Sequence, residues 1–166
     1  MGEIDKIVKD KTVSYEGLLD IKGLFHSIDS WFAINGYDNL DTHSEEKLLE
    51  TGKKLLVKKK PSKKLSDYAK SNFEVNVLVT DMKDVEVEHQ GVKKKLWHGK
   101  ANIQINAFLE TDYKGSLDNK PFYLFFRVLA DAFVHKSYVN QWKKKILNDA
   151  EALLKEIKSF LNITMK

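Results

Sequence analysis

The chain has 166 residues, of which 42% are hydrophobic and 31% are charged, a balance that suits one folded domain and excludes an intrinsically disordered chain. It contains no cysteine, which excludes disulfides, cysteine nucleophiles, cysteine-ligated zinc and iron–sulfur clusters. No apolar run approaches the roughly 18 residues of a membrane-spanning helix, and the N-terminus fits neither a signal peptide nor a myristoylation site. We therefore expect a single α+β domain over residues 1–166, without a transmembrane segment and in the cytoplasm.

The first predicted elements are a strand and a helix. Apolar and polar side chains alternate over residues 11–19, which predicts a strand in which Gly17 marks a bulge or a close backbone approach. Asp20 follows at the N-cap of a helix whose apolar stripe begins at Ile21 and repeats at i, i+3, i+4 and i+7. Gly36 stands where a left-handed residue would end that helix.

The middle of the chain predicts an antiparallel meander. Residues 45–50 and 53–60 form a predicted hairpin about Thr51-Gly52. Strict alternation then predicts two strands whose apolar side chains share one buried face. These side chains are Phe73, Val75, Val77 and Val79 on the first strand and Ile103, Ile105, Ala107 and Leu109 on the second. Between them, Gln90-Gly91 predicts a turn.

The last part of the chain predicts two helices. Pro121 fits the first position of a helix over residues 122–134, which is apolar almost all round. A long amphipathic helix follows over residues 139–161, with Ile146, Leu153 and Ile157 in its apolar stripe. The order of elements therefore predicts an α+β fold: a curved antiparallel sheet of about six strands, packed on the long C-terminal helix and a shorter helix after the first strand.

This order of elements resembles the helix-grip layout of the START and Bet v 1-like superfamily, although that superfamily usually has two helices where this chain has one. The resemblance implies a curved sheet around the C-terminal helix, often with an apolar ligand between them. Separately, the stretch KTVSYEGLLDIKGLFHSIDSWFAINGYD and the ending EIKSFLNI resemble a family of small archaeal proteins. That second resemblance implies no catalytic or binding residue.

Candidate catalytic and metal-binding groups are sparse. His43 with Glu45 and Glu46 lacks the further ligands in a defined geometry that a metal site needs, so we expect no metal and no cofactor. The acidic residues between positions 81 and 88 flank apolar ones, which favours a solvated strand face over paired catalytic carboxylates. The sequence contains neither a glycine-rich phosphate loop nor a nucleophile elbow, and we predict no catalytic residue.

Lysine clusters give the strongest functional signal, because 27 of the 28 basic residues are lysine and the net charge is +4. The predicted polyanion-binding residues are Lys53, Lys54, Lys58, Lys59, Lys60, Lys63, Lys64, Lys93, Lys94, Lys95 and Trp97. Lysines that converge in space neutralise several phosphates, and an exposed tryptophan stacks on a base. We therefore predict a non-enzymatic binding protein for RNA or a ribosomal surface. The alternative for the clusters is a set of separate solubilising patches.

Two other functions stay open. One is a helix-grip-like carrier of an apolar small molecule, and the other is an enzyme that uses Tyr15, Tyr113 or an acidic residue in such a cavity. The apolar segment 121–134 predicts an additional interface or pocket. Its residues are Phe122, Tyr123, Leu124, Phe125, Phe126 and Val128. The sheet and final helix, a protein partner or second subunit, and a ligand or membrane surface are the alternatives for what covers it.

Overall fold

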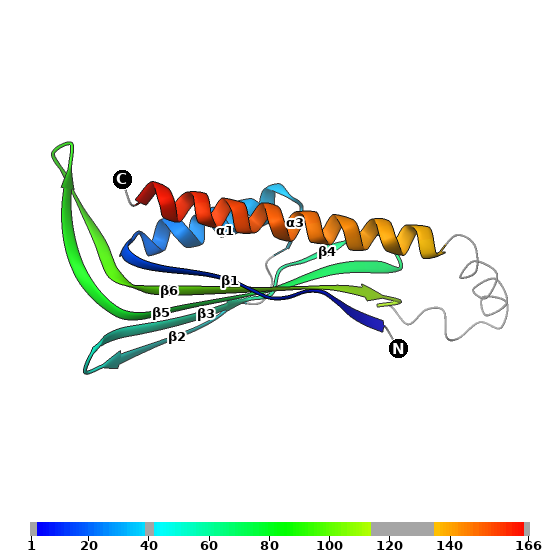
Figure 1. The fold of residues 1–166 in the computed structure, drawn as a ribbon, viewed down its shortest axis with the longest axis horizontal. Helices are drawn as coiled ribbons and strands as arrows, with labels where there is room; N and C mark the ends of the chain where they lie inside the picture. The colour runs from blue at the N-terminus through cyan, green and yellow to red at the C-terminus, as the bar shows by residue number, and fades with distance from the viewer. Residues whose placement is uncertain (1–2, 39–41, 114–134, 165–166) are drawn as a thin grey trace.

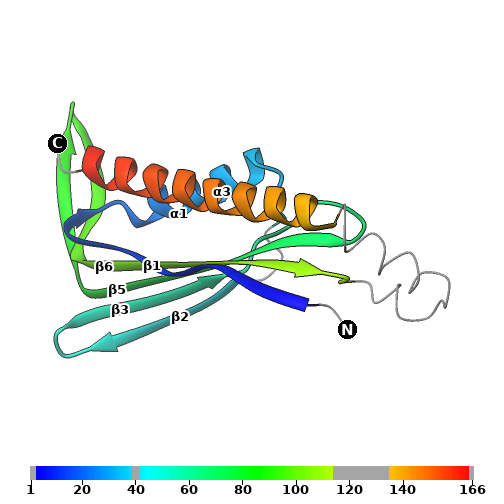
Figure 2. The same cartoon turned by 45° about the vertical axis from the view of Figure 1, so that its right-hand side comes forward.

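The computed structural model describes residues 3–38, 42–113 and 135–164, and shows an antiparallel sheet with two helices on one of its faces (Figures 1 and 2). The strands are β1 (Glu3–Leu19), β2 (Thr42–Leu49), β3 (Gly52–Lys59), β4 (Ser62–Lys64), β5 (Ala69–His89) and β6 (Val92–Thr111). The helices are α1 (Ile21–Ile34) and α3 (His135–Thr164). The predicted α+β class and order of elements are confirmed, whereas the helix predicted over residues 122–134 lies outside the described residues.

The six-stranded sheet is open, with the order β1-β6-β5-β3-β2 and with β4 paired to β5. The predicted hairpin between β2 and β3 is confirmed, but its turn lies at Glu50-Thr51 and not at Thr51-Gly52, because Leu49 pairs with Gly52. The strands β5 and β6 extend well beyond their predicted cores and meet at the predicted turn, where His89 pairs with Val92. Among the described residues, no helix is both long enough and apolar enough to span a bilayer.

Period-two alternation decides which side chains the helices bury. Val75 pairs with Ile105 and Val77 pairs with Ile103, and all four side chains are completely buried. The predicted shared face is therefore confirmed. The stripe of α3 completes the same hydrophobic cluster, with Ile146, Leu153 and Ile157 all buried. Both described helices, α1 and α3, lie on this side of the sheet, and we call the opposite side the open face (Figures 1 and 2).

A row of glycines lets the sheet bend. Gly17 of β1 pairs with Gly99 of β6, and a Cβ on Gly99 would lie only 2.9 Å from the Thr80 carbonyl oxygen of β5. A Cβ on Gly52 of β3 would lie 3.1 Å from the backbone of Asp81, which takes a left-handed φ of 54° inside a register shift of β5. Glycines and bulges of this kind introduce curvature into sheets. Beyond the bend, the β5–β6 ribbon rises beside the C-terminal end of α3 (Figure 1).

The helix signals predicted from the sequence are also confirmed. The Asp20 side chain accepts a hydrogen bond from the backbone nitrogen of Gly23 and caps α1, and Gly36 follows the helix with a φ of 81°. The sequence predicted a bulge or a close backbone approach at Gly17, but the atoms nearest to a Cβ there would belong to the Tyr15 side chain, with its hydroxyl at 3.0 Å. The register shifts of β1 fall nearer its start, so a bulge at Gly17 is wrong.

A buried polar network joins three elements of the fold. The Tyr37 hydroxyl, just after α1, donates to Asp149 Oδ2 of α3 at 2.8 Å and lies 3.1 Å from Ser71 Oγ of β5. Its ring packs edge-on against Phe32 and Phe73. Burial raises the pKa of Tyr37 well above its usual range; the hydrogen bond with Ser71 opposes this rise, and the Asp149 carboxylate adds to it. The neutral phenol is therefore part of the folded structure.

The first prediction concerns the core under α3. Leu153 is 0% exposed, whereas Leu147 on the same helix is 40% exposed. Leu153→Ala should lower the free energy of unfolding by about 2–5 kcal/mol, because it removes buried methyl groups and leaves a cavity. Leu147→Ala is the matched control and should cost under about 0.5 kcal/mol, as expected at a surface position. Urea denaturation measures both values, and equal losses would contradict the packing described.

The second prediction concerns the pH dependence that Tyr37 introduces. A raised folded pKa contributes stability that is fully present below the unfolded pKa of about 10 and is lost as the pH rises through the folded value. The wild-type protein should therefore lose more stability between about pH 9 and 11 than Tyr37→Phe, which has no proton to lose at this position. Urea denaturation across this range tests the difference. Parallel losses in both proteins would show that Tyr37 does not contribute.

Candidate functional site

The lysines of β3 do not share one surface, because side chains of a strand alternate between its faces. Val57 pairs with Val77, which places Val57, Lys59 and Lys53 on the helix-covered face. Lys54 and Lys58 lie on the open face. The lysine cluster predicted from the sequence is therefore divided between two environments.

The lysines on the helix-covered face have partners inside the fold. Lys59 is only 6% exposed, and its Nζ donates to Asp29 Oδ1 of α1 at 2.6 Å and lies 5.5 Å from the Phe25 ring centroid. Lys53 forms an ion pair with Glu46 of β2 and lies 5.2 Å from the Trp97 ring centroid. These contacts stabilise the fold, and they pair two ammonium groups that were predicted to bind a polyanion with partners in the same chain.

Two further lysines of the predicted set, one on β4 and one on β6, donate hydrogen bonds to the two ends of α1. Lys63 donates to the Asn35 carbonyl oxygen at 2.7 Å, at the C-terminal end of α1. Lys94 donates to Asp20 Oδ2 at 2.8 Å, while the other carboxylate oxygen caps α1. Burial would raise the pKa of Asp20, but the Lys94 ammonium and the Gly23 N–H outweigh it and hold this pKa below its ordinary value.

The remaining residues of the predicted set are distributed over the surface. Lys60, Lys64, Lys93 and Lys95 are exposed. Near the tip of the β5–β6 ribbon, Lys93 pairs with Glu88 and Lys95 pairs with Glu86, which interleaves the charges. Trp97 is half-buried against the hydrophobic core, with Lys53 over its ring. The structure thus brings together Lys54 and Lys58 on the open face, but it does not bring the two lysine clusters into one patch.

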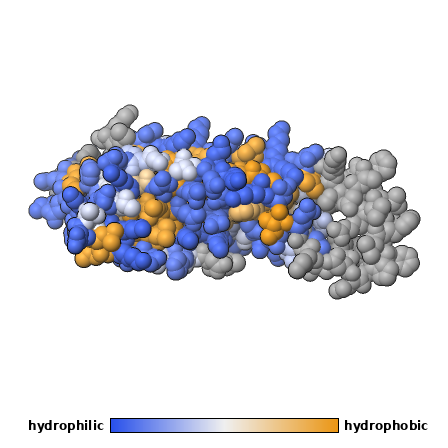
Figure 3. Space-filling view, turned by 60° about the horizontal axis from the view of Figure 1, so that its bottom comes forward, coloured by the Kyte–Doolittle hydropathy of each residue, from blue (hydrophilic) through white to orange (hydrophobic). Residues whose placement is uncertain are grey.

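The open face carries polar side chains across its central strands. Its defining residues are Ser14 and Glu16 of β1, Lys54, Leu56 and Lys58 of β3, Asn76, Leu78 and Thr80 of β5, and Lys100, Asn102 and Gln104 of β6. A view toward this side of the molecule shows a largely hydrophilic surface with separated hydrophobic patches (Figure 3). Such a surface can offer many hydrogen bonds.

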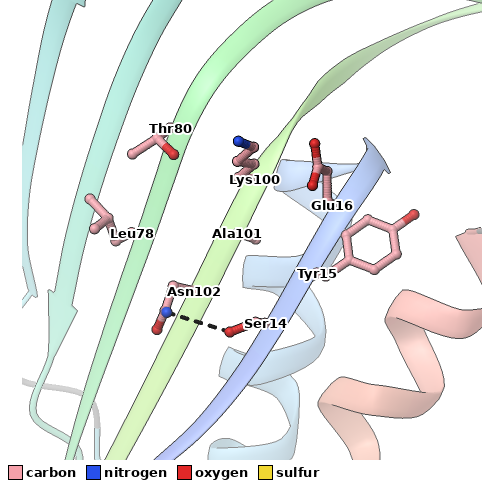
Figure 4. A pocket seen from close by; sticks show the side chains of 8 residues that line it. All are labelled: Ser14, Tyr15, Glu16, Leu78, Thr80, Lys100, Ala101 and Asn102. Carbon is pink, nitrogen blue, oxygen red and sulfur yellow. Dashed lines mark hydrogen bonds between the residues drawn. The ribbon is translucent and has the colours of Figure 1, made fainter.

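Hydrogen bonds between the strands fix some of these side chains. Asn76 Nδ2 donates to Gln104 Oε1 at 3.4 Å, and Gln104 Nε2 donates to Asp10 Oδ1 at 3.2 Å. Asn102 Nδ2 donates to Ser14 Oγ at 3.5 Å (Figure 4). Within the described residues, Asn76 Oδ1 is buried and has no hydrogen-bond partner. The longer of these bonds are weak, which leaves the amides able to exchange them for a ligand's groups.

A shallow hollow of about 480 Å³ lies on the open face (Figure 4). Side chains around it come from Ser14 and Glu16 of β1, Thr80 of β5, and Lys100 and Asn102 of β6. Its polar side chains can donate and accept hydrogen bonds.

A second hollow of about 550 Å³ adjoins the first at the bend, since Glu16 and Lys100 line both. His98 and Asp81 belong to it, and Asp81 lies 3.8 Å from the Lys100 ammonium. Its charges are therefore mixed. Among the described residues, no three histidine or carboxylate side chains gather closely enough to hold a metal ion.

The described side chains of the helix-covered face form one hydrophobic cluster between the sheet and the helices. Val75, Ile103 and Ile105 of the sheet and Ile146 and Leu153 of α3 are all completely buried there. The residues predicted as an apolar interface or pocket, 122–126 and 128, lie outside the described residues. An apolar carrier and an enzyme therefore stay predictions.

Sequence reasoning missed the amide and hydroxyl groups of the open face. From the sequence alone, Asn76, Asn102 and Gln104 are only the polar half of an alternating pattern. The available signal is their chemistry: neutral amides stand at neighbouring positions of the paired strands β5 and β6, among the charged residues of the same face.

The third prediction separates the two lysine environments. Lys59→Gln should lower the free energy of unfolding by about 1–3 kcal/mol, because it removes a charged hydrogen bond and leaves the Asp29 carboxylate without this partner. Lys58→Gln, one residue away on the open face, should change it by under about 0.5 kcal/mol. Urea denaturation of both variants measures the contrast. A larger loss for Lys58→Gln than for Lys59→Gln would contradict the burial of Lys59 described above.

Comparisons with known proteins add no functional assignment. No family model matches the chain, and no curated protein or solved structure matches it either. The function must therefore be inferred from the side chains of the structure itself.

Proposed function

We propose that the protein is a non-enzymatic binding module whose open face binds single-stranded RNA. The observation that carries this proposal is the position of Lys54 and Lys58 beside rows of amide and hydroxyl groups, on the sheet face opposite α1 and α3. Within the described part of the chain, neither lysine forms an ion pair. Lysines attract phosphates, and side-chain amides and hydroxyls hydrogen-bond to the exposed base edges and 2′-hydroxyls of single strands.

The register of the sheet supports a ligand that crosses several strands. Lys58 pairs with Asn76, and Asn76 pairs with Gln104, so a cation and two amides form one row. Neighbouring strands lie about 4.8 Å apart, and Lys54 lies about 13 Å from Lys58 along β3 at about 3.3 Å per residue. Two lysines at that spacing can contact phosphates of different nucleotides while the bases lie over the amides.

Acidic side chains on the same face limit how basic this surface is. Glu16 pairs with Lys100 across the β1–β6 ladder, and Glu45 is ion-paired with Lys47. The proposed site therefore rests on two phosphate contacts and on hydrogen bonds, and not on a broad positive field. For a single strand, two neutralised phosphates correspond to a slope of log affinity against log salt of about −1.4.

The fourth prediction tests this site by RNA titration. A fluorescent single-stranded RNA of mixed sequence should bind the wild-type protein at low salt, with a slope of about −1.4 over 50–300 mM salt. The double variant Lys54→Gln/Lys58→Gln should lose about tenfold in affinity or more, and its slope should approach zero. Fluorescence anisotropy gives both quantities.

The double variant Lys93→Gln/Lys95→Gln is the matched control, because it removes the same charge from the β5–β6 ribbon. It should keep most of the affinity and the salt slope of the wild type. Equal losses in the two double variants would indicate general attraction by net charge and would contradict a site on the open face. Absence of binding by the wild type at 50 mM salt would reject RNA as the ligand.

A further inference from the structure

The two edges of the sheet are protected very differently. At β1 the pairing with β6 shifts register twice, between Lys6 and Val8 and between Val8 and Lys11. Asp10 lies in this region with a left-handed φ of 49°, and Asp5 forms a 2.5 Å ion pair with Lys143 of α3. Irregular pairing, lysines and cover by a helix all discourage a further strand from adding to an edge.

Among the described residues, the β2 edge has almost none of these protections. Its eight residues, THSEEKLL, are all exposed, and they pair with β3 without a register shift. The strand contains no proline or glycine and only one lysine. Leu48 is 86% exposed and Leu49 is 50% exposed. In Figure 2, β2 lies at the free margin of the sheet, away from both helices. A regular, unprotected edge of this kind is a template for pairing with another strand.

We propose that β2 pairs antiparallel with β2 of a second copy of this chain, with Glu46 on the two-fold axis. In this register, Glu45 of each copy lies opposite Lys47 of the other. Both side chains belong to the open face, so the faces of the two copies match and the two sheets become one. Opposite charges at directly opposed positions stabilise an antiparallel pair.

Other two-fold registers with matched faces lack this complementarity. An axis at Lys47 would oppose the two Lys47 ammonium groups and place Glu45 against Leu49. An axis at Glu45 would oppose the two Glu45 carboxylates and place Lys47 against His43. Each of these two registers opposes like charges at its axis without gaining a glutamate–lysine pair, whereas the register centred on Glu46 gains two such pairs, and for this reason we place the axis at Glu46.

The charges near the axis are compatible with that register. The two Glu46 side chains meet there, but each forms an ion pair with Lys53 of its own chain. The hydrogen bond and charge of Lys47, with smaller contributions from His43 and Lys54, hold the pKa of Glu45 below its ordinary value. The Glu45 carboxylate is therefore ionised at neutral pH, and in the dimer it would face the second copy's Lys47 in addition to its ion pair with Lys47 of its own chain.

The fifth prediction tests the pairing by charge exchange. Sedimentation equilibrium of the full chain should show a concentration-dependent dimer. Glu45→Lys and Lys47→Glu should each raise the dimer dissociation constant by at least about tenfold, because each places like charges opposite each other twice. An equimolar mixture of these two variants should dimerise again, since both pairs between positions 45 and 47 in the heterodimer are then complementary. The double variant Glu45→Lys/Lys47→Glu should also recover dimerisation.

Glu86→Lys is the control for charge reversal away from β2, and it should leave the dimer unchanged. Both positions on β2 are exposed, so circular dichroism and thermal melts should show an intact fold in every variant. A wild type that stays monomeric up to about 200 µM, roughly 5 kcal/mol of association free energy, would overturn the proposal. So would a mixture of the two single variants that stays monomeric. Neither result depends on RNA, so this inference and the proposed function can fail separately.

Discussion

The constraint on which the structure depends is the alternation of side chains along β5 and β6, combined with the position of α1 and α3 on the same face of the sheet. Val77 and Ile103 can reach α1 and α3 because they point to the same side, and their neighbours Asn76 and Asn102 must then point away. A shift of one residue in either strand would bury amides and expose the core. This single periodicity therefore fixes the hydrophobic core and the polar open face together.

Charged residues that fall on the covered side of this pattern need partners. Lys59 continues the buried face of β3, and burial of an unpaired ammonium is costly. Asp29 of α1 meets this cation, and the Phe25 ring lies beside it. The same logic applies to Tyr37, whose buried hydroxyl bonds to α3 and approaches β5. Polar contacts and the apolar stripe of α3 together thus determine where the helices pack on the sheet.

Curvature and edges complete the shape. The bend at Gly99 and Asp81 carries the β5–β6 ribbon toward α3, while β2 and β3 continue along the lower part of the sheet (Figure 1). The open face thereby extends to a second hollow at the bend, and β2 is left as a regular edge. The proposed RNA site and the proposed dimer edge both lie on parts of the sheet that α1 and α3 do not contact: the open face and β2.

The sequence by itself determined the α+β class, the Asp20 cap, the hairpin that joins β2 and β3, and the buried faces of β5 and β6, because each depends on local periodicity or on the chemistry of one or two neighbouring residues. The tertiary structure decided what the lysines do. Lys58 and Lys59 are neighbours with identical chemistry, yet one is exposed and the other is buried against Asp29, thirty residues away. Lysine density in the sequence could not separate them, because only the alternation of β3, its register against β5 and the position of α1 decide which cation faces solvent and which completes the core.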